Sequence, residues 1–301
     1  MGARHVERGC RLNLQQWLKE YAPRQDLAPS TADGYADAIA SLERHAGRTL
    51  RLRDLTADLV NAWIGAQLEA DYARITVRNQ ACAVVTLWRA AAKAKKAPRL
   101  PDTIRRVKVP TPIPEAWTLD ELQRVLDACD RLKSRVKRMG GVHWRQLSRA
   151  MVLVGYHSGL RPCDLRRLPM AKLLVAEPFV VLQDKTDWPI TIRLPLEAIE
   201  AVRATAPPKR ETFLPLHRSS VAEKFREVVK LAGVSGSPKW LRRTGATAVE
   251  REHPGAAMSF LGHKTPGLAL KHYVDQRIAG QNRPMPPLLT KPLRVVSAEA
   301  S

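Results

Sequence analysis

The chain has 301 residues, with 50 Lys and Arg against 29 Asp and Glu, and its formal net charge is +21. A hydrophobic fraction of 45% is enough to build ordinary cores and excludes a wholly disordered chain. The length favours two domains. The strong positive charge favours binding to a polyanion, above all a nucleic acid, although a GC-rich genome also produces Arg-rich chains.

Targeting signals are absent from the sequence. No apolar run approaches the roughly 18 residues of a membrane span, and residues 1–10 carry neither the apolar core of a secretory signal nor a myristoylation motif. The cysteines lie far apart without a CxxC pair, so we expect reduced thiols, with neither a disulfide framework nor a zinc site. These features predict a cytoplasmic, nucleoid-associated protein that has no membrane partner. The cysteines are Cys10, Cys82, Cys129 and Cys163.

The first segment, residues 1–96, has apolar residues at helical spacing from about residue 11 and no strand-like alternation. The spacing predicts a compact unit of four helices. We expect Ser30 and Thr31 to cap the second helix, Gly47 to end it and Thr56 to cap the third.

A basic, Pro-rich stretch follows at residues 97–115. Its prolines forbid a continuing helix, which predicts a linker between two domains. Its charge would suit a strap along a phosphate backbone, and a solvated linker without a partner is the alternative. The residues expected to bind DNA in and just before this linker are Lys93, Lys95, Lys96, Arg99, Arg105, Arg106 and Lys108.

The second region, residues 116–283, opens on a capping box formed by Thr118 and Glu121. A strongly apolar helix is expected through residues 147–154, and helices return from about residue 220. Between them, two strands are predicted on either side of a polar turn, DKTDW.

The predicted strands span residues 178–182 and 190–194, and a Pro-rich tail occupies residues 284–301. The whole pattern predicts a mainly α fold with one small antiparallel β-hairpin.

The usual nucleotide and metal motifs are missing. The fragment GHKT at residues 262–265 lacks the glycine and lysine spacing of a phosphate loop, and there is no HExxH motif and no paired-carboxylate cluster. We therefore expect no metal and no cofactor. What remains is a set of mostly cationic residues, each of which alone would most often be a surface or core residue. They are Arg161, Asp164, Lys185, Arg242, His263 and Tyr273.

Taken in order, these residues stand in recognisable boxes. Arg161 lies in the motif GLRPCDL, and Lys185 lies in the predicted hairpin turn. Arg242 ends the motif KWLR, which is followed by RTGAT. His263 ends the motif LGH, and Tyr273 follows ten residues later. This order resembles the tyrosine recombinase (phage integrase) family over about residues 11–276.

The resemblance implies an N-terminal helical core-binding (SAM-like) domain, a basic linker and an α+β catalytic domain. It implies a site-specific recombinase or integrase that cleaves and rejoins double-stranded DNA through a 3′-phosphotyrosine, without metal or ATP. It also implies a homotetramer on two DNA sites and admits accessory DNA-bending proteins as partners. In the matching roles, Tyr273 is the nucleophile, Arg161 and Arg242 clamp the phosphate, Lys185 protonates the leaving oxygen, His263 donates to the phosphate, and Asp164 supports Arg161.

One position departs from the family pattern. Lys239 stands where the family most often has His, and a lysine can act as a base only if its pKa is lowered. Lys239 is kept as a catalytic candidate, and the adjacent Arg243 is expected to bind the DNA backbone. The alternatives are a tyrosine transposase, a catalytically silent DNA-binding protein on the same scaffold, and a type IB topoisomerase.

Overall fold

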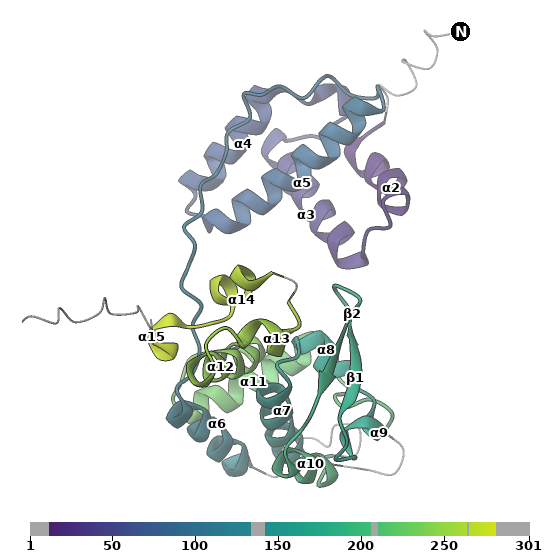
Figure 1. Cartoon of the computed structure of the whole chain (residues 1–301). Helices are drawn as coiled ribbons and strands as arrows, with labels where there is room; N and C mark the ends of the chain where they lie inside the picture. Colours follow the sequence, from purple (N-terminus) through teal and green to yellow (C-terminus); the bar gives the residue numbers. More distant parts are fainter. Residues whose placement is uncertain (1–11, 134–141, 206–209, 264, 281–301) are drawn as a thin grey trace, which may run out of the picture. The chain divides into compact units, whose positions relative to one another are not determined.

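The computed structural model describes residues 12–133, 142–205, 210–263 and 265–280. Within these ranges the chain is mainly helical, and its sheet consists of two antiparallel strands (Figure 1). The predicted fold class is confirmed. The chain divides into two compact units, Met1–Thr111 and Pro112–Ser301. None of the described helices is both long enough and apolar enough to cross a membrane.

The first unit contains the expected helices, whose apolar stripes meet in one core around three tryptophans. Trp17 and Trp88 also satisfy their indole N–H groups, which donate to the carbonyl oxygens of Leu87 (3.1 Å) and Pro98 (2.8 Å). The elements are α2 (Leu14–Arg24), α3 (Pro29–Ala46), the short 3-10 helix η1 (Leu52–Asp54), α4 (Ala57–Glu69) and α5 (Arg74–Lys93).

Two of the predicted helix ends in this unit are confirmed and one is wrong. Thr56 caps α4 by accepting a hydrogen bond from the backbone N–H of Leu59, and Gly47 ends α3 in the left-handed conformation. Ser30 and Thr31 do not cap α3, because the helix already begins at Pro29. The fixed φ of a proline suits the first helical position, so the two hydroxyl residues lie inside the first turn.

Much of the predicted linker packs against the first unit. Leu100, Ile104 and Val107 are half-buried on its core. The side chain of Asn61 donates to the carbonyl oxygen of Thr103 at 3.1 Å and accepts from the N–H of Arg105 at 2.8 Å. This segment is therefore held on a surface of the first unit, which places its exposed arginines and lysines in defined positions.

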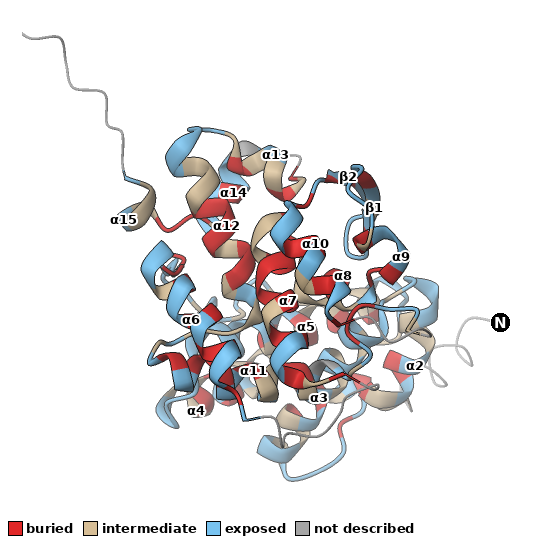
Figure 2. Ribbon diagram, turned by 90° about the horizontal axis from the view of Figure 1, so that it is seen from below, coloured by how far each residue is buried: buried red, intermediate tan, exposed pale blue. Residues whose placement is uncertain are grey.

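The second unit is built around α7 (Trp144–Ser158) and α12 (Pro238–Glu252), which pack against each other and are largely buried (Figure 2). Thr118 and Glu121 form the predicted capping box at the start of α6. The other helices are α6 (Leu119–Arg131), α8 (Pro162–Arg167), α9 (Met170–Leu173), α10 (Leu196–Arg203), α11 (Arg218–Ala232), α13 (Ala257–Leu261), α14 (Pro266–His272) and α15 (Gln276–Ala279).

The predicted hairpin is present, with shifted boundaries. Strand β1 (Phe179–Gln183) pairs antiparallel with β2 (Trp188–Ile192), and Gln183 stands opposite Trp188. Trp188 thus belongs to the sheet and not to the turn, because pairing continues until the chain must reverse at residues 184–187. The predicted tail, residues 284–301, lies outside the described residues.

Candidate active site

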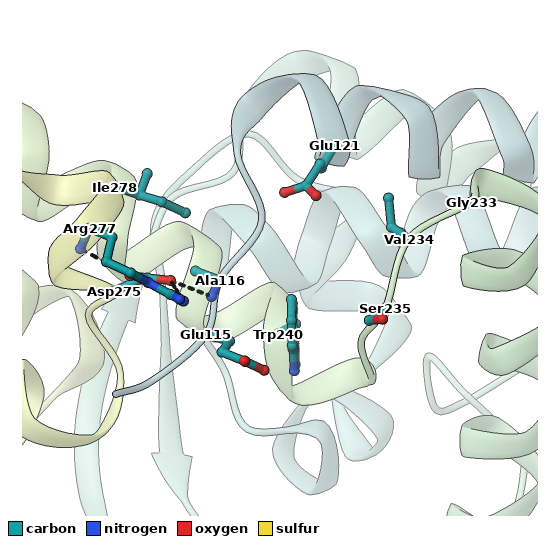
Figure 3. A pocket seen from close by; sticks show the side chains of 10 residues that line it. All are labelled: Glu115, Ala116, Glu121, Gly233, Val234, Ser235, Trp240, Asp275, Arg277 and Ile278. Atoms are coloured by element: carbon teal, nitrogen blue, oxygen red, sulfur yellow. Dashed lines mark hydrogen bonds and ion pairs between the residues drawn. The ribbon is translucent and has the colours of Figure 1, made fainter. Parts of the chain in front are cut away.

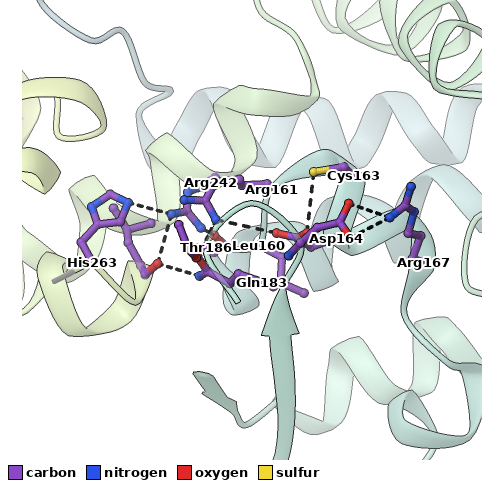
Figure 4. Close-up of polar contacts among 12 residues, drawn as sticks. Leu160, Arg161, Cys163, Asp164, Arg167, Gln183, Thr186, Arg242 and His263 are labelled. Carbon is purple, nitrogen blue, oxygen red and sulfur yellow. Dashed lines mark hydrogen bonds and ion pairs between the residues drawn. The ribbon is translucent and has the colours of Figure 1, made fainter. Parts of the chain in front are cut away.

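Arg242 lies at the centre of the second unit. It stands on the inner face of α12 and is only 2% exposed. One terminal nitrogen of its guanidinium donates to the carbonyl oxygen of Gly159. The other donates to the carbonyl oxygen of Leu261 (3.1 Å) and to Nε2 of His263 (3.0 Å), as Figure 4 shows. Burial lowers the pKa of Arg242 to about 10, so the side chain still carries its charge at neutral pH.

This buried charge has no ion-pair partner in the described part of the chain, and the Asp164 carboxylate offsets the lowering of its pKa only from a longer distance. No described carboxylate forms an ion pair with Arg242, and its Nε atom is buried without a hydrogen-bond partner. A buried cation costs several kcal/mol unless an anion compensates it. The site is therefore electrostatically prepared for an anionic ligand.

Tyr273 and His263 lie beside Arg242. The centre of the Tyr273 ring is 4.7 Å from Cζ of Arg242 and 4.9 Å from the centre of the His263 ring. Gly262, which ends α13 in the left-handed conformation, turns the chain so that His263 enters the site. The predicted nucleophile Tyr273, Arg242 and His263 are thus brought together by α12 and by the ends of α13 and α14.

His263 is neutral in this arrangement. Burial, followed by the charges of Arg242, Arg161 and His272, lowers its pKa from 6.5 to about 4. Since a guanidinium can only donate, Nε2 of His263 accepts from Arg242 and the ring proton is on Nδ1. Nδ1 is buried and has no hydrogen-bond partner among the described residues, so its N–H can donate to a ligand that enters the site.

The chain just after Tyr273 is anchored by Asp275. Its backbone N–H donates to Oγ1 of Thr247 at 3.0 Å, and its buried carboxylate accepts from the N–H of Ala116 (3.3 Å) and pairs with Arg277 (2.7 Å). Figure 3 shows the last two contacts at the edge of a hollow of ≈ 470 Å³. Asp275 thereby fixes where α14 ends, a role that the sequence pattern did not indicate.

Arg161 approaches Arg242 from the other side. It is the residue before α8, and its guanidinium donates to Oε1 of the buried Gln183. Asp164 lies next to it, with 3.9 Å between the nearest carboxylate oxygen and Nη1 of Arg161. The other oxygen of Asp164 accepts from the backbone N–H of Asp184 at 3.1 Å. Gln183 was not a sequence candidate; the only signal was a polar residue ending the apolar strand FVVLQ.

Of the remaining site candidates, the two lysines are exposed and Arg243 is half-buried. Lys185 lies in the hairpin turn and Lys239 in the first turn of α12, and neither makes a hydrogen bond or ion pair with a described residue. Lys239 precedes Arg242 by three residues, so both are on one face of α12. Arg243 donates to the carbonyl oxygen of Glu115 at 3.5 Å. The structure thus gathers Arg161, Arg242, His263 and Tyr273, and leaves the roles of both lysines as predictions.

One group of side chains among the described residues could hold a metal ion. Ligand atoms of Cys163, Asp164 and Asp184 lie within 4.8 Å of one another. The Asp184 carboxylate already binds Arg167 at 2.6 Å, and Asp164 accepts from the thiol of Cys163 and from a backbone N–H. Protein donors thus occupy this group, and the absence of a resident metal stays a prediction.

The first unit carries the predicted basic surface. Lys93, Lys95 and Arg99 are exposed around a hollow of ≈ 640 Å³ at the end of α5. Lys96 is different, because it pairs with Glu20 at 2.7 Å and lies 5.0 Å from the centre of the Trp17 ring. The charge of Lys96 is therefore largely neutralised within the first unit and contributes less to the basic surface. Arg105, Arg106 and Lys108 are exposed on the segment that packs over α4 and α5.

No protein-family model and no curated protein sequence matches the chain. Solved structures do match it along most of its length. A dimer of lambda integrase residues 75–356 bound to a COC′ core site superimposes with a TM-score of 0.68 and 19% identity, covering 93% of this chain and 100% of that one.

The chain has the tyrosine recombinase fold. The Tn1549 transposon integrase in complex with transposon right end DNA gives a TM-score of 0.65 at 15% identity, covering 87% of this chain and 95% of that one. XerH recombinase bound to palindromic difH substrate gives 0.63 at 14%, covering 92% and 88%. The matches extend over both units of the chain.

Proposed function

We propose that the chain is a site-specific DNA recombinase or integrase that cleaves and rejoins DNA through a covalent bond to Tyr273. The observation that carries the proposal is the buried, unpaired charge of Arg242 in contact with the rings of Tyr273 and His263. A phosphodiester supplies the missing negative charge, and the phenol beside it supplies a nucleophile.

In the proposed reaction, Tyr273 loses its Oη proton to solvent within the cationic site, and the resulting phenolate attacks the scissile phosphorus. A bond forms between Oη and phosphorus, and the bond to the 5′-oxygen breaks. Arg161 and Arg242 stabilise the charge that develops on the non-bridging oxygens, and Nδ1–H of His263 donates to one of them. Lys185 gives a proton to the leaving 5′-oxygen. The products are a 3′-phosphotyrosine and a free 5′-hydroxyl, and reversal on another strand needs no ATP.

Lys239 is proposed as an additional donor to the bound phosphate. Its place in the first turn of α12, on the face of Arg242, supports this role. At a helix start the N–H groups and the partial positive charge favour an anion as well.

The proposed partner is double-stranded DNA, bound by the basic surfaces of both units. A lambda integrase of the same fold was crystallised as a tetramer bound to a Holliday junction. We infer a homotetramer on two DNA sites for this chain by that analogy, with accessory DNA-bending proteins as further partners.

Covalent capture tests the function directly. The full chain is incubated in EDTA with nicked duplexes made from the DNA that flanks its gene, denatured, and analysed for protein–DNA adducts. We expect adducts with the wild type and with Tyr72→Phe, which changes an exposed phenol of the first unit, and none with Tyr273→Phe. Adducts with Tyr273→Phe would disprove the nucleophile assignment.

A tyrosine transposase is the second candidate, supported by the match to the Tn1549 transposon integrase. Sequencing the captured junctions separates the two, since a recombinase selects one fixed site and a transposase joins element ends to varied targets. Complete absence of adducts, with DNA binding retained, would instead favour a silent DNA-binding protein. Relaxation of supercoiled plasmid by the monomer would favour a topoisomerase.

A further inference from the structure

Gln183 is the most buried polar side chain near the candidate site that the proposed chemistry does not use. It is 0% exposed, although it is the last residue of β1 and immediately precedes an exposed turn. Its carbonyl oxygen accepts from Arg161 and, at 3.3 Å, from the hydroxyl of Thr186. Its amide nitrogen donates to the carbonyl oxygen of Leu261 at 2.9 Å. Both ends of the amide are therefore engaged.

The contact to Leu261 joins Gln183 to the other half of the site. The same carbonyl oxygen also accepts from Nη2 of Arg242 at 3.1 Å. A short chain of hydrogen bonds thus runs from Arg161 through Gln183 and Leu261 to Arg242. The two guanidiniums repel each other, and this chain sets their relative position with neutral groups only.

The side chain of Gln183 packs closely against the turn before His263. A Cβ added at Gly262 would lie 2.3 Å from Cγ2 of Ile190 and 3.0 Å from the amide nitrogen of Gln183. The turn before His263 is therefore in direct contact with the hairpin. The turn that carries Lys185 is tied to Gln183, whose backbone carbonyl oxygen accepts from the N–H groups of Thr186 (3.1 Å) and Asp187 (2.8 Å).

For Arg161, Gln183 is a closer partner than Asp164. The Asp164 carboxylate lies 3.9 Å from the Arg161 guanidinium and receives its hydrogen bonds from Asp184 and Cys163. The direction of the Arg161 side chain is thus set chiefly by Gln183.

We propose that Gln183 is a positioning residue that holds Arg161 against Arg242 and fixes the hairpin turn so that Lys185 reaches the leaving oxygen. This inference rests on the proposed strand-transfer function. One neutral side chain would then set the positions of both the phosphate clamp, Arg161 with Arg242, and the general acid, Lys185. A misplacement of about 1 Å in such a constellation is enough to slow a reaction about 10²-fold.

The test compares two leaving groups in single-turnover cleavage. One DNA has the ordinary 5′-oxygen at the scissile bond, and the other has sulfur there. A thiolate leaves without a proton, so loss of a general acid is rescued by sulfur, whereas loss of a phosphate clamp is not. Lys185→Ala is the reference for the first defect and Arg161→Ala for the second.

We expect Gln183→Met to have a lowered unfolding midpoint, because the buried hydrogen bonds of the amide are lost, and to bind DNA as the wild type does. It should cleave the oxygen substrate about 10²-fold more slowly than the wild type. Sulfur should restore part of that loss, because one of the two disturbed groups is the acid. Thr186→Val, an exposed change that removes one contact to Gln183, should slow oxygen cleavage several-fold and sulfur cleavage hardly at all. It serves as the deciding variant if Gln183→Met does not fold.

The proposal is overturned if Gln183→Met folds and cleaves both substrates at the wild-type rate, or if sulfur restores nothing. It is equally overturned if Gln183→Met does not fold and Thr186→Val matches the wild type on oxygen. Failure of the underlying function looks different, because the wild-type chain itself would then form no adduct on either substrate.

Discussion

Acid should destabilise the second unit through His263. Its pKa is lowered from 6.5 to about 4, chiefly by burial and then by Arg242, Arg161 and His272. The unfolded chain then binds a proton more readily than the folded chain, so the free energy of unfolding falls as the pH drops through this interval. The two pKa values give a loss of about 2 kcal/mol between about pH 7 and about pH 5, and about 3 kcal/mol in the limit of full protonation.

The variant His263→Gln isolates this contribution, because glutamine keeps an acceptor for Arg242 and does not titrate. Urea-dependent hydrogen exchange of the buried amides of α7 reports the free energy of unfolding of the second unit. The difference between wild type and variant should change by about 2 kcal/mol between about pH 7 and about pH 5. His253→Gln, an exposed histidine of the same unit, should follow the wild type. A constant difference between wild type and His263→Gln would refute the buried, neutral state of His263.

Three further changes test packing, chemistry and DNA binding. Gly245→Ala places a Cβ 2.3 Å from a backbone oxygen of α7 and should lower the free energy of unfolding by about 1–3 kcal/mol in thermal unfolding. Gly267→Ala is the control, because its added Cβ meets no atom within 4 Å and should not lower the free energy of unfolding. Lys239→Ala should slow covalent capture by about 10²-fold while binding persists, and unchanged cleavage would remove it from the catalytic set. Lys93→Met should reduce the slope of log DNA affinity against log salt concentration by about 1. Lys96→Met should reduce that slope by clearly less, because the charge of Lys96 is already paired with Glu20. Equal reductions for the two variants would contradict this reasoning.

Local patterns in the sequence were sufficient for most of the fold. Helical spacing, the caps at Thr56 and Thr118 and the glycine end at Gly47 depend on residues within one or two turns, so a single sequence contains them. The hairpin could also be predicted, because its two strands and the turn between them are adjacent in the sequence. The error at Ser30 and Thr31 arose because two good capping residues followed a proline that is itself a good first residue.

Only part of the candidate site could be predicted from the sequence. The order of the motifs around Arg161, Arg242, His263 and Tyr273 indicated which residues would gather and predicted a role for each. Gln183 and Asp275 were missed, because their importance comes from partners far along the chain, such as the carbonyl oxygen of Leu261. A glutamine at the end of an apolar strand carries no signal until that strand is packed.

The sequence alone therefore specified the elements, the net charge and the chemical inventory. Tertiary packing decided which charges are exposed and which are buried without an ion-pair partner, as at Arg242, and it made His263 neutral. The reason is physical. Desolvation and Coulomb energies depend on distances through space between α7, α12 and the hairpin, and these distances exist only once the segments are folded together.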